Sequence, residues 1–130
     1  MLSEMAGQIR ELAGLRVTID NVVQMENSQG PPDRPYTFVY FITIHNDSDD
    51  TVTIKGRKWV VTDDNDNRIV VEGDGVVGQF PRLEPGEKFS YNSSHAVACD
   101  SVAEGAYIGI KDDGEPVLTR IPAFQLRTDS

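Results

Sequence analysis

The chain has 130 residues and a formal net charge of −9, from 21 acidic against 12 basic side chains. This length suffices for one domain with an ordinary core, whereas the negative charge disfavours binding to nucleic acid and to anionic membranes. The single cysteine, Cys99, excludes an internal disulfide framework, and no secretion signal or run of about 18 apolar residues occurs, so we expect a cytoplasmic protein.

The first 14 residues carry a helical pattern. Apolar residues recur at steps of three and four, Ser3 is suited to cap the N-terminus, and Gly14 is suited to end the helix, with the apolar positions at Leu2, Met5, Ile9 and Leu12. We expect residues 1–14 to form a short helical extension. Its apolar stripe either packs against its own domain or makes a homodimer contact.

From Leu15 the apolar period changes to two, which is typical of β-strands. We expect strands over residues 15–23, 36–45, 51–55, 58–62, 68–72, 88–94, 103–111 and 117–124. The segment at 36–45 is apolar on both faces and so predicts a central strand. Gly56 indicates a bulge or a crossing between sheets, and Trp59 is the expected core anchor. Seven to eight short strands separated by turn residues predict an all-β sandwich.

A glycine- and proline-rich segment follows the fifth of these strands. It reads Gly73-Asp74-Gly75-Val76-Val77-Gly78-Gln79-Phe80-Pro81-Arg82-Leu83-Glu84-Pro85-Gly86-Glu87. This segment resembles the characteristic motif of the ApaG family (DUF525), G-x-G-V-x-G-x-x-P-x-L-x-P-G-E. Further motifs support the resemblance: the aromatic strand Tyr36–Asn46, Arg57-Lys58-Trp59, Gly105-Ala106-Tyr107 and Ile121-Pro122-Ala123-Phe124-Gln125-Leu126.

The resemblance covers residues 15–126 and implies an immunoglobulin-like or fibronectin type III-like sandwich. We therefore expect a domain at 15–126, preceded by the extension at 1–14 and followed by a disordered tail at 127–130. One segment departs from the family pattern, because Ser93-Ser94-His95-Ala96 stands where the family usually has Ser-Gly-Cys-Pro. The resemblance also implies a role in protein recognition and a link to cobalt resistance and magnesium efflux.

Gly73-x-Gly75-x-x-Gly78 matches the dinucleotide-binding fingerprint in its letters. That motif needs a helix opening directly after it, so that the helix N-terminus meets a pyrophosphate. Here Pro81 and Pro85 follow, and no helical pattern begins. We therefore interpret the glycines as turn residues. A backbone nest for a nucleotide or pyrophosphate, with a divalent cation and positive charge from Arg57, Lys58, Arg68 and Arg82, stays open as the alternative.

Other catalytic and metal patterns are weak. Asp63-x-Asn65-x-Asn67 resembles a calcium loop but has Arg68 where glycine is required, so we expect a hairpin turn. His45, His95 and Cys99 are too few and too scattered for zinc, and no nucleophile, base and orienting group can be placed together. We predict a non-catalytic protein without cofactor or resident metal.

The predicted function is recognition of an unidentified protein partner by the glycine-rich loop and the neighbouring strand. Such surfaces of β-sandwiches, the end loops and exposed edges, commonly bind partners. The residues expected at this site are Gly73, Asp74, Gly75, Gly78, Gln79, Phe80, Arg57, Trp59 and Arg82.

Overall fold

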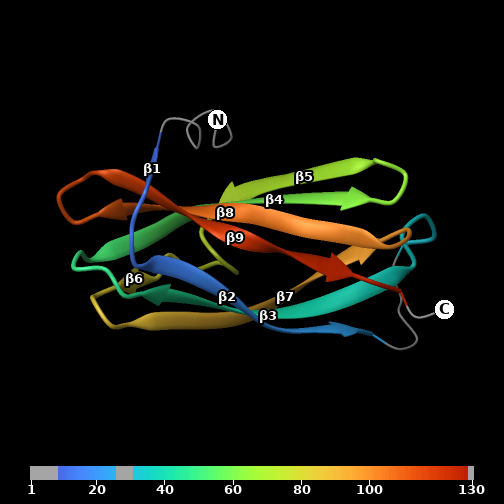
Figure 1. Ribbon diagram of the computed structural model, residues 1–130, viewed down its shortest axis with the longest axis horizontal. Helices are drawn as coiled ribbons and strands as arrows, with labels where there is room; N and C mark the ends of the chain where they lie inside the picture. The colour runs from blue at the N-terminus through green and yellow to red at the C-terminus, as the bar shows by residue number, and fades with distance from the viewer. Residues whose placement is uncertain (1–8, 26–30, 129–130) are drawn as a thin grey trace.

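The computed structural model describes residues 9–25 and 31–128, which form two β-sheets packed face to face (Figure 1). The strands are β1 (Arg10–Glu11), β2 (Leu15–Gln24), β3 (Tyr36–Asn46), β4 (Val52–Asp63), β5 (Arg68–Asp74), β6 (Arg82–Leu83), β7 (Lys88–Val97), β8 (Ser101–Lys111) and β9 (Pro116–Leu126). The predicted all-β sandwich is confirmed. No helix in the described part of the chain is long and apolar enough to cross a membrane.

The larger sheet has the order β1-β9-β8-β4-β5, and β6 pairs with β4. The smaller sheet has the order β2-β3-β7, so β3 is central as predicted. All pairs are antiparallel except β1 with β9. In Figure 1 the larger sheet lies above the smaller one, and β9 runs toward the right-hand end of the molecule.

Strand β4 joins two segments that the sequence predicted as separate strands. Its register against β8 shifts between Ile54 and Gly56, which confirms a bulge at Gly56 rather than a crossing between sheets. The bulge lets one long strand run on through the glycine, because the extra residue is absorbed locally. Two-residue strands β1 and β6 were not predicted.

The predicted N-terminal helix is wrong over the residues that the structure describes. Arg10 and Glu11 form β1, which pairs with Val117 and Leu118 of β9. Leu12 follows, is buried in the core and donates its backbone N–H to Leu118 O at 3.1 Å. The pairing of β1 with β9 and the burial of Leu12 therefore outweigh the helical spacing of the apolar residues. Ile9 lies at a bend directly before β1, and Leu2 and Met5, the remaining residues of the predicted stripe, lie outside the described residues.

The core lies between the sheets and is built from alternate residues of the strands. On β3 the buried side chains recur with period two, as expected for a strand with one face inside. Trp59 is 2% exposed, which confirms it as a core anchor. Fully buried side chains from four strands and one loop fill the layer, including Ile42, Ile44, Val52, Ile54, Val76, Tyr107, Val117, Leu118 and Leu126.

Asn46 connects the end of β3 to the loop that follows it and to β6. Its side chain is fully buried, and its Nδ2 donates to Asp50 O and Leu83 O, both at 2.8 Å. Its Oδ1 accepts from Ser48 N at 3.1 Å and from Ser48 Oγ at 2.6 Å. The amide is satisfied on both sides, so burying it costs little, and the turn predicted at 46–50 is confirmed.

The two sides of the sandwich differ. On one side β2 and β9 pack together, and Thr119 Oγ1 of β9 donates to Leu15 O of β2 at 2.8 Å. On the other side each sheet ends in an edge strand, β5 in the larger sheet and β7 in the smaller one. The candidate site residues from Arg57 to Phe80 gather on this second side or next to it.

Candidate binding site

The glycine-rich loop is a tight β-hairpin. Val76 and Gln79 exchange two backbone hydrogen bonds, of 2.8 and 2.9 Å, around the turn Val77-Gly78. Val77 has φ 44° and Gly78 has φ 79°, the paired positive values of a type I′ turn. Gly75 precedes the hairpin with φ 64°, and a Cβ there would lie 2.4 Å from Gln79 O. The glycines at 75 and 78 therefore serve turns and close approach, as interpreted from the sequence.

The arginine of β4 braces this loop. Arg57 Nη1 donates to Asp74 O at 2.8 Å and to Gly75 O at 3.2 Å. The guanidinium lies over Gly73, its partner across the β4–β5 pair, so that a Cβ on Gly73 would lie 2.8 Å from Arg57 Cζ. Arg57, Gly73, Asp74 and Gly75 thus form one cluster, in which the arginine acts on backbone carbonyls.

The same geometry bears on phosphate binding. The backbone N–H groups of Gly75, Val76 and Gln79 donate to Lys55 O, Gln79 O and Val76 O, respectively. A nest needs successive N–H groups directed at one anion, and three of those in this segment are already used. The chain continues from the hairpin into β6, so no helix begins directly after the glycines.

The remaining predicted site residues lie in three different places. Phe80 is 52% exposed beside the hairpin, with Lys55 Nζ 5.7 Å from its ring centroid, while Trp59 lies in the core. Arg82 belongs to β6 and pairs with Thr53, at the opposite end of β4 from the β4–β5 turn. Its guanidinium contacts Asp112 at 2.7 Å and Glu84 at 3.4 Å, so it is not part of the Arg57 cluster.

Strand β5 exposes apolar side chains along its length. Ile69, Val70 and Val71 are all exposed, with Val70 at 51%. Beyond the strand, Val77 is 49% exposed at the hairpin tip. A valine at positive φ is strained, because its branched Cβ crowds the backbone. We call Ile69, Val70, Val71, Val77 and Phe80 together the β5–hairpin surface.

A cleft of about 270 Å³ opens between β5 and β7. Its lining comes from four strands and the hairpin: Tyr40, Arg57, Trp59, Val71, Val77, Tyr91, Ser93, Ser94 and His95. Sequence reasoning placed Arg57 and Trp59 at the site but missed Tyr91, Ser93, Ser94 and His95. The one available signal was that residues 93–96 depart from the family pattern.

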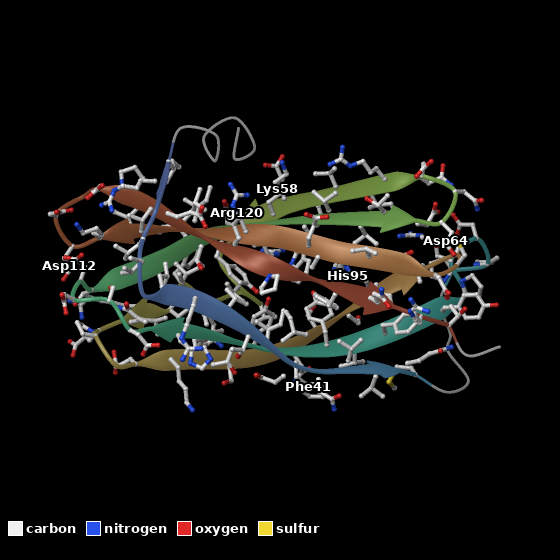
Figure 2. All side chains as sticks on the ribbon, viewed as in Figure 1. Phe41, Lys58, Asp64, His95, Asp112 and Arg120 are labelled. Carbon is white, nitrogen blue, oxygen red and sulfur yellow. The ribbon has the colours of Figure 1, made fainter. Side chains whose placement is uncertain are left out.

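His95 lies between the two sheets (Figure 2). Its ring stacks on Tyr40 at 4.9 Å and meets the edge of Trp59 at 5.0 Å. Burial lowers the pKa of His95 to about 4, so the imidazole is neutral at pH 7. Its Nε2 is buried without a hydrogen-bond partner among the residues that the structure describes. Nearby, Tyr91 and Tyr107 share a hydrogen bond between their hydroxyls, and burial raises the pKa of both.

The segment that resembles a calcium loop is a hairpin turn between β4 and β5, as predicted. Asp63 Oδ1 accepts from Asn65 N at 2.8 Å and from Asn67 N at 3.0 Å, and Oδ2 accepts from Asn67 Nδ2 at 3.2 Å. The carboxylate thus closes the turn itself. Within residues 9–25 and 31–128, no three His, Cys, Asp or Glu side chains are grouped to hold a metal ion.

His45 contacts Thr18, at 2.9 Å between Nε2 and Oγ1. Because Thr18 Oγ1 donates its proton to Asp20 Oδ1 at 2.8 Å, His45 Nε2 must carry the hydrogen of the first bond. The imidazole therefore does not act as a base toward Thr18 in this arrangement.

A sequence model of the ApaG domain matches residues 26–109. The chain belongs to the ApaG family. Protein ApaG of Methylococcus capsulatus is 39% identical over 113 residues, which cover 86% of this chain and 89% of that protein. Protein ApaG of Vibrio cholerae is 37% identical over 103 residues, covering 78% and 82%. These matches confirm the family resemblance drawn from the glycine-rich segment.

Solved structures share the ApaG fold of this chain. An X-ray structure of a structural-genomics target superposes with a TM-score of 0.81 at 29% identity, covering 90% of this chain and 89% of the other. The crystal structure of a Bordetella pertussis protein described as ApaA gives a TM-score of 0.78 at 27% identity, covering 92% and 97%. The two-sheet architecture is therefore common to experimentally determined relatives.

Proposed function

We propose that this chain is a non-catalytic protein-recognition module whose partner binds the β5–hairpin surface. The observation that carries the proposal is the concentration of exposed large apolar side chains within residues 69–80, on an edge strand and the hairpin that follows it. An edge strand also offers unpaired N–H and C=O groups, to which an extended partner segment can add as a further strand.

Strain at Val77 supports the same proposal. A type I′ turn favours Asn-Gly or Gly-Gly, yet here a branched apolar residue occupies the first central position with φ 44°. A strained, exposed side chain costs stability in the free protein. Contact with a partner would explain why valine stands at this position, because binding would bury the apolar surface of Val77 and Phe80.

The non-catalytic part of the proposal rests on the side-chain arrangement. In the described parts of the chain, His95 Nε2 bonds to no nucleophile, and His45 Nε2 serves as a donor to Thr18. A cytoplasmic protein acting through a partner would influence cobalt or magnesium homeostasis indirectly, by recognition rather than by holding the ion. The alternative remains nucleotide or pyrophosphate binding at Gly73–Gly78, with a divalent cation; it is favoured by the charge of Arg57 beside the loop.

Matched substitutions on two strands test the proposal. Val70→Lys places a charge on the edge strand β5, while Val102→Lys places the same charge on the exposed face of β8, an interior strand. In extracts of the cells that make the protein, a photo-crosslinking residue at Ile69 of β5, present in every variant, should yield a discrete partner. We expect Val70→Lys to abolish that product and Val102→Lys to leave it unchanged. Equal loss from both variants, or no product from the protein that carries neither substitution, would refute the proposal.

A thermal-shift scan tests the alternative. The ligands are GTP, ATP, pyrophosphate, Mg²⁺ and Co²⁺, and a ligand at 100 times its Kd adds about 2.7 kcal/mol to stability. We expect no saturable shift. A saturable shift with a nucleotide or pyrophosphate that persists both in Arg82→Ala and in Val71→Phe, which fills the cleft, would instead support anion binding at the loop. The oligomeric state of the purified chain, measured by analytical ultracentrifugation, shows whether the partner is a second copy of the chain.

A further inference from the structure

The cleft between β5 and β7 has the composition of a small-molecule site. Its inner wall is aromatic, with Tyr40, Trp59 and His95 in mutual ring contact at centroid distances of 4.9–5.0 Å. Its volume of about 270 Å³ lies just below the range usual for drug-sized ligands, which is about 300–1,000 Å³. A single ring with one substituent fits within that volume.

Charge within the cleft is opposite to that of the whole molecule. Among the described residues that line it, Arg57 is the one that carries a full charge at pH 7, since His95 is neutral. The hydrogen bonds from Nη1 to two backbone carbonyls fix the guanidinium in place without neutralising it. An anion entering the cleft therefore meets a preorganised cation in a partly enclosed site, where attraction is stronger than in bulk water.

Polar groups beside the aromatic wall can fix the orientation of a bound ligand. Ser93 and Ser94 line the cleft, and the Ser93 hydroxyl lies near that of Tyr40. The mouth is apolar, with Val71 on one rim and Val77 from the hairpin beside it. A mostly apolar cavity with few polar groups at fixed positions is the usual composition of a ligand pocket.

We propose that this cleft binds a small planar carboxylate of single-ring size, with the ring against Tyr40, Trp59 and His95 and the carboxylate facing Arg57. Planar rings gain from stacked and edge contacts with aromatic side chains, and a guanidinium matches the two oxygens of a carboxylate. The cleft shares Val71 and Val77 with the β5–hairpin surface, but binding there requires no protein partner.

Trp59 is the only tryptophan of the chain, so its indole N–H gives a single reporter in NMR spectra of the full-length protein. Three probes separate the contributions: benzoate has the ring and the charge, benzamide has the ring alone, and acetate has the charge alone. We expect benzoate to shift the Trp59 signal saturably with a Kd on the order of 1 mM. Benzamide and acetate should each bind at least about tenfold more weakly.

Two adjacent valines of β5 provide a matched pair of variants. Val71→Phe fills the mouth, whereas Val70→Phe adds the same bulk on the opposite face of the strand. We expect Val71→Phe to weaken benzoate binding by at least about tenfold and Val70→Phe to leave it unchanged. Both positions are exposed on an edge strand, so both variants should fold.

The proposal is overturned if benzoate leaves the Trp59 signal unchanged up to a concentration on the order of 10 mM. It is also overturned if Val71→Phe and Val70→Phe bind benzoate equally well, because the ligand would then lie outside the cleft. Equal affinity for benzoate and benzamide would remove the role of Arg57 and overturn the carboxylate assignment. A partner that still crosslinks to the β5–hairpin surface in any of these cases would leave the protein-recognition proposal intact.

Discussion

Replacing Gly73 by alanine tests whether this glycine is required by its neighbour. Gly73 faces Arg57 across the β4–β5 pair, and an added Cβ would lie 2.8 Å from Arg57 Cζ. The guanidinium is the far end of a flexible side chain, so it can move aside. Moving it breaks the bonds from Nη1 to Asp74 O and Gly75 O, of 2.8 and 3.2 Å.

The expected cost follows from those two bonds. A hydrogen bond contributes a net 0.5–1.5 kcal/mol, and both bonds here are at least partly solvent-exposed, so losing them costs about 1–2 kcal/mol. Alanine restricts the unfolded chain more than glycine and returns about 0.5 kcal/mol. We expect Gly73→Ala to lower the free energy of unfolding by about 1 kcal/mol, or the melting temperature by about 4 °C.

A double-mutant cycle in urea isolates the mechanism. With Arg57→Ala as background, the added Cβ meets no guanidinium, so Gly73→Ala should be neutral or stabilise by about 0.5 kcal/mol. The coupling energy between the two positions should therefore be about 1–2 kcal/mol. If Gly73→Ala costs the same in both backgrounds, the glycine is required for another reason and the reasoning fails.

Three further substitutions have defined outcomes. Val77→Asn supplies the Asn-Gly pair that a type I′ turn favours with Gly78 and should raise the free energy of unfolding in urea by about 1 kcal/mol; a decrease would contradict strain at φ 44°. Gly105→Ala should cost more than about 3 kcal/mol, since a Cβ would lie 2.0 Å from the backbone oxygen of Lys58, and an unchanged urea midpoint would contradict this. Burial lowers the pKa of His95 from 6.5 to about 4, so the unfolded chain binds more protons between these values. Stability should therefore fall by up to about 3 kcal/mol as pH drops from about 6.5 to about 4, and His95→Gln should remove that part of the pH dependence.

The sandwich was predictable because period-two alternation follows directly from burying one face of a strand. Trp59 and the turns at 46–50 and 63–67 were predictable for similarly local reasons, since Asn and Asp close turns with their own side chains. Strand β1 was not predictable. Its place beside β9 depends on Leu12 reaching the core near Leu118, a contact between segments far apart in the sequence.

The candidate site was predictable only in part. The glycine-rich hairpin and Arg57 could be found because glycine spacing and a nearby charge are visible in the sequence. The cleft could not, because Tyr40, Tyr91 and His95 reach it from β3 and β7, which belong to the other sheet. The sequence suggests His95 only as a candidate metal ligand, whereas its structural role is an aromatic contact between the sheets.

Arg57 links the two proposals, and this affects which variants can separate them. Its guanidinium braces the hairpin through Asp74 O and Gly75 O and also provides the charge of the cleft. Removing the guanidinium would both loosen the β5–hairpin surface and weaken the binding of an anion in the cleft. A loss of partner binding or of ligand binding in Arg57→Ala could therefore not be assigned to one site. The side chains at positions 70 and 71 lie on opposite faces of β5, and substituting them leaves the hydrogen bonds of Arg57 to the hairpin intact. The neighbouring valines, rather than the arginine, therefore decide between partner recognition on the strand edge and ligand binding in the cleft.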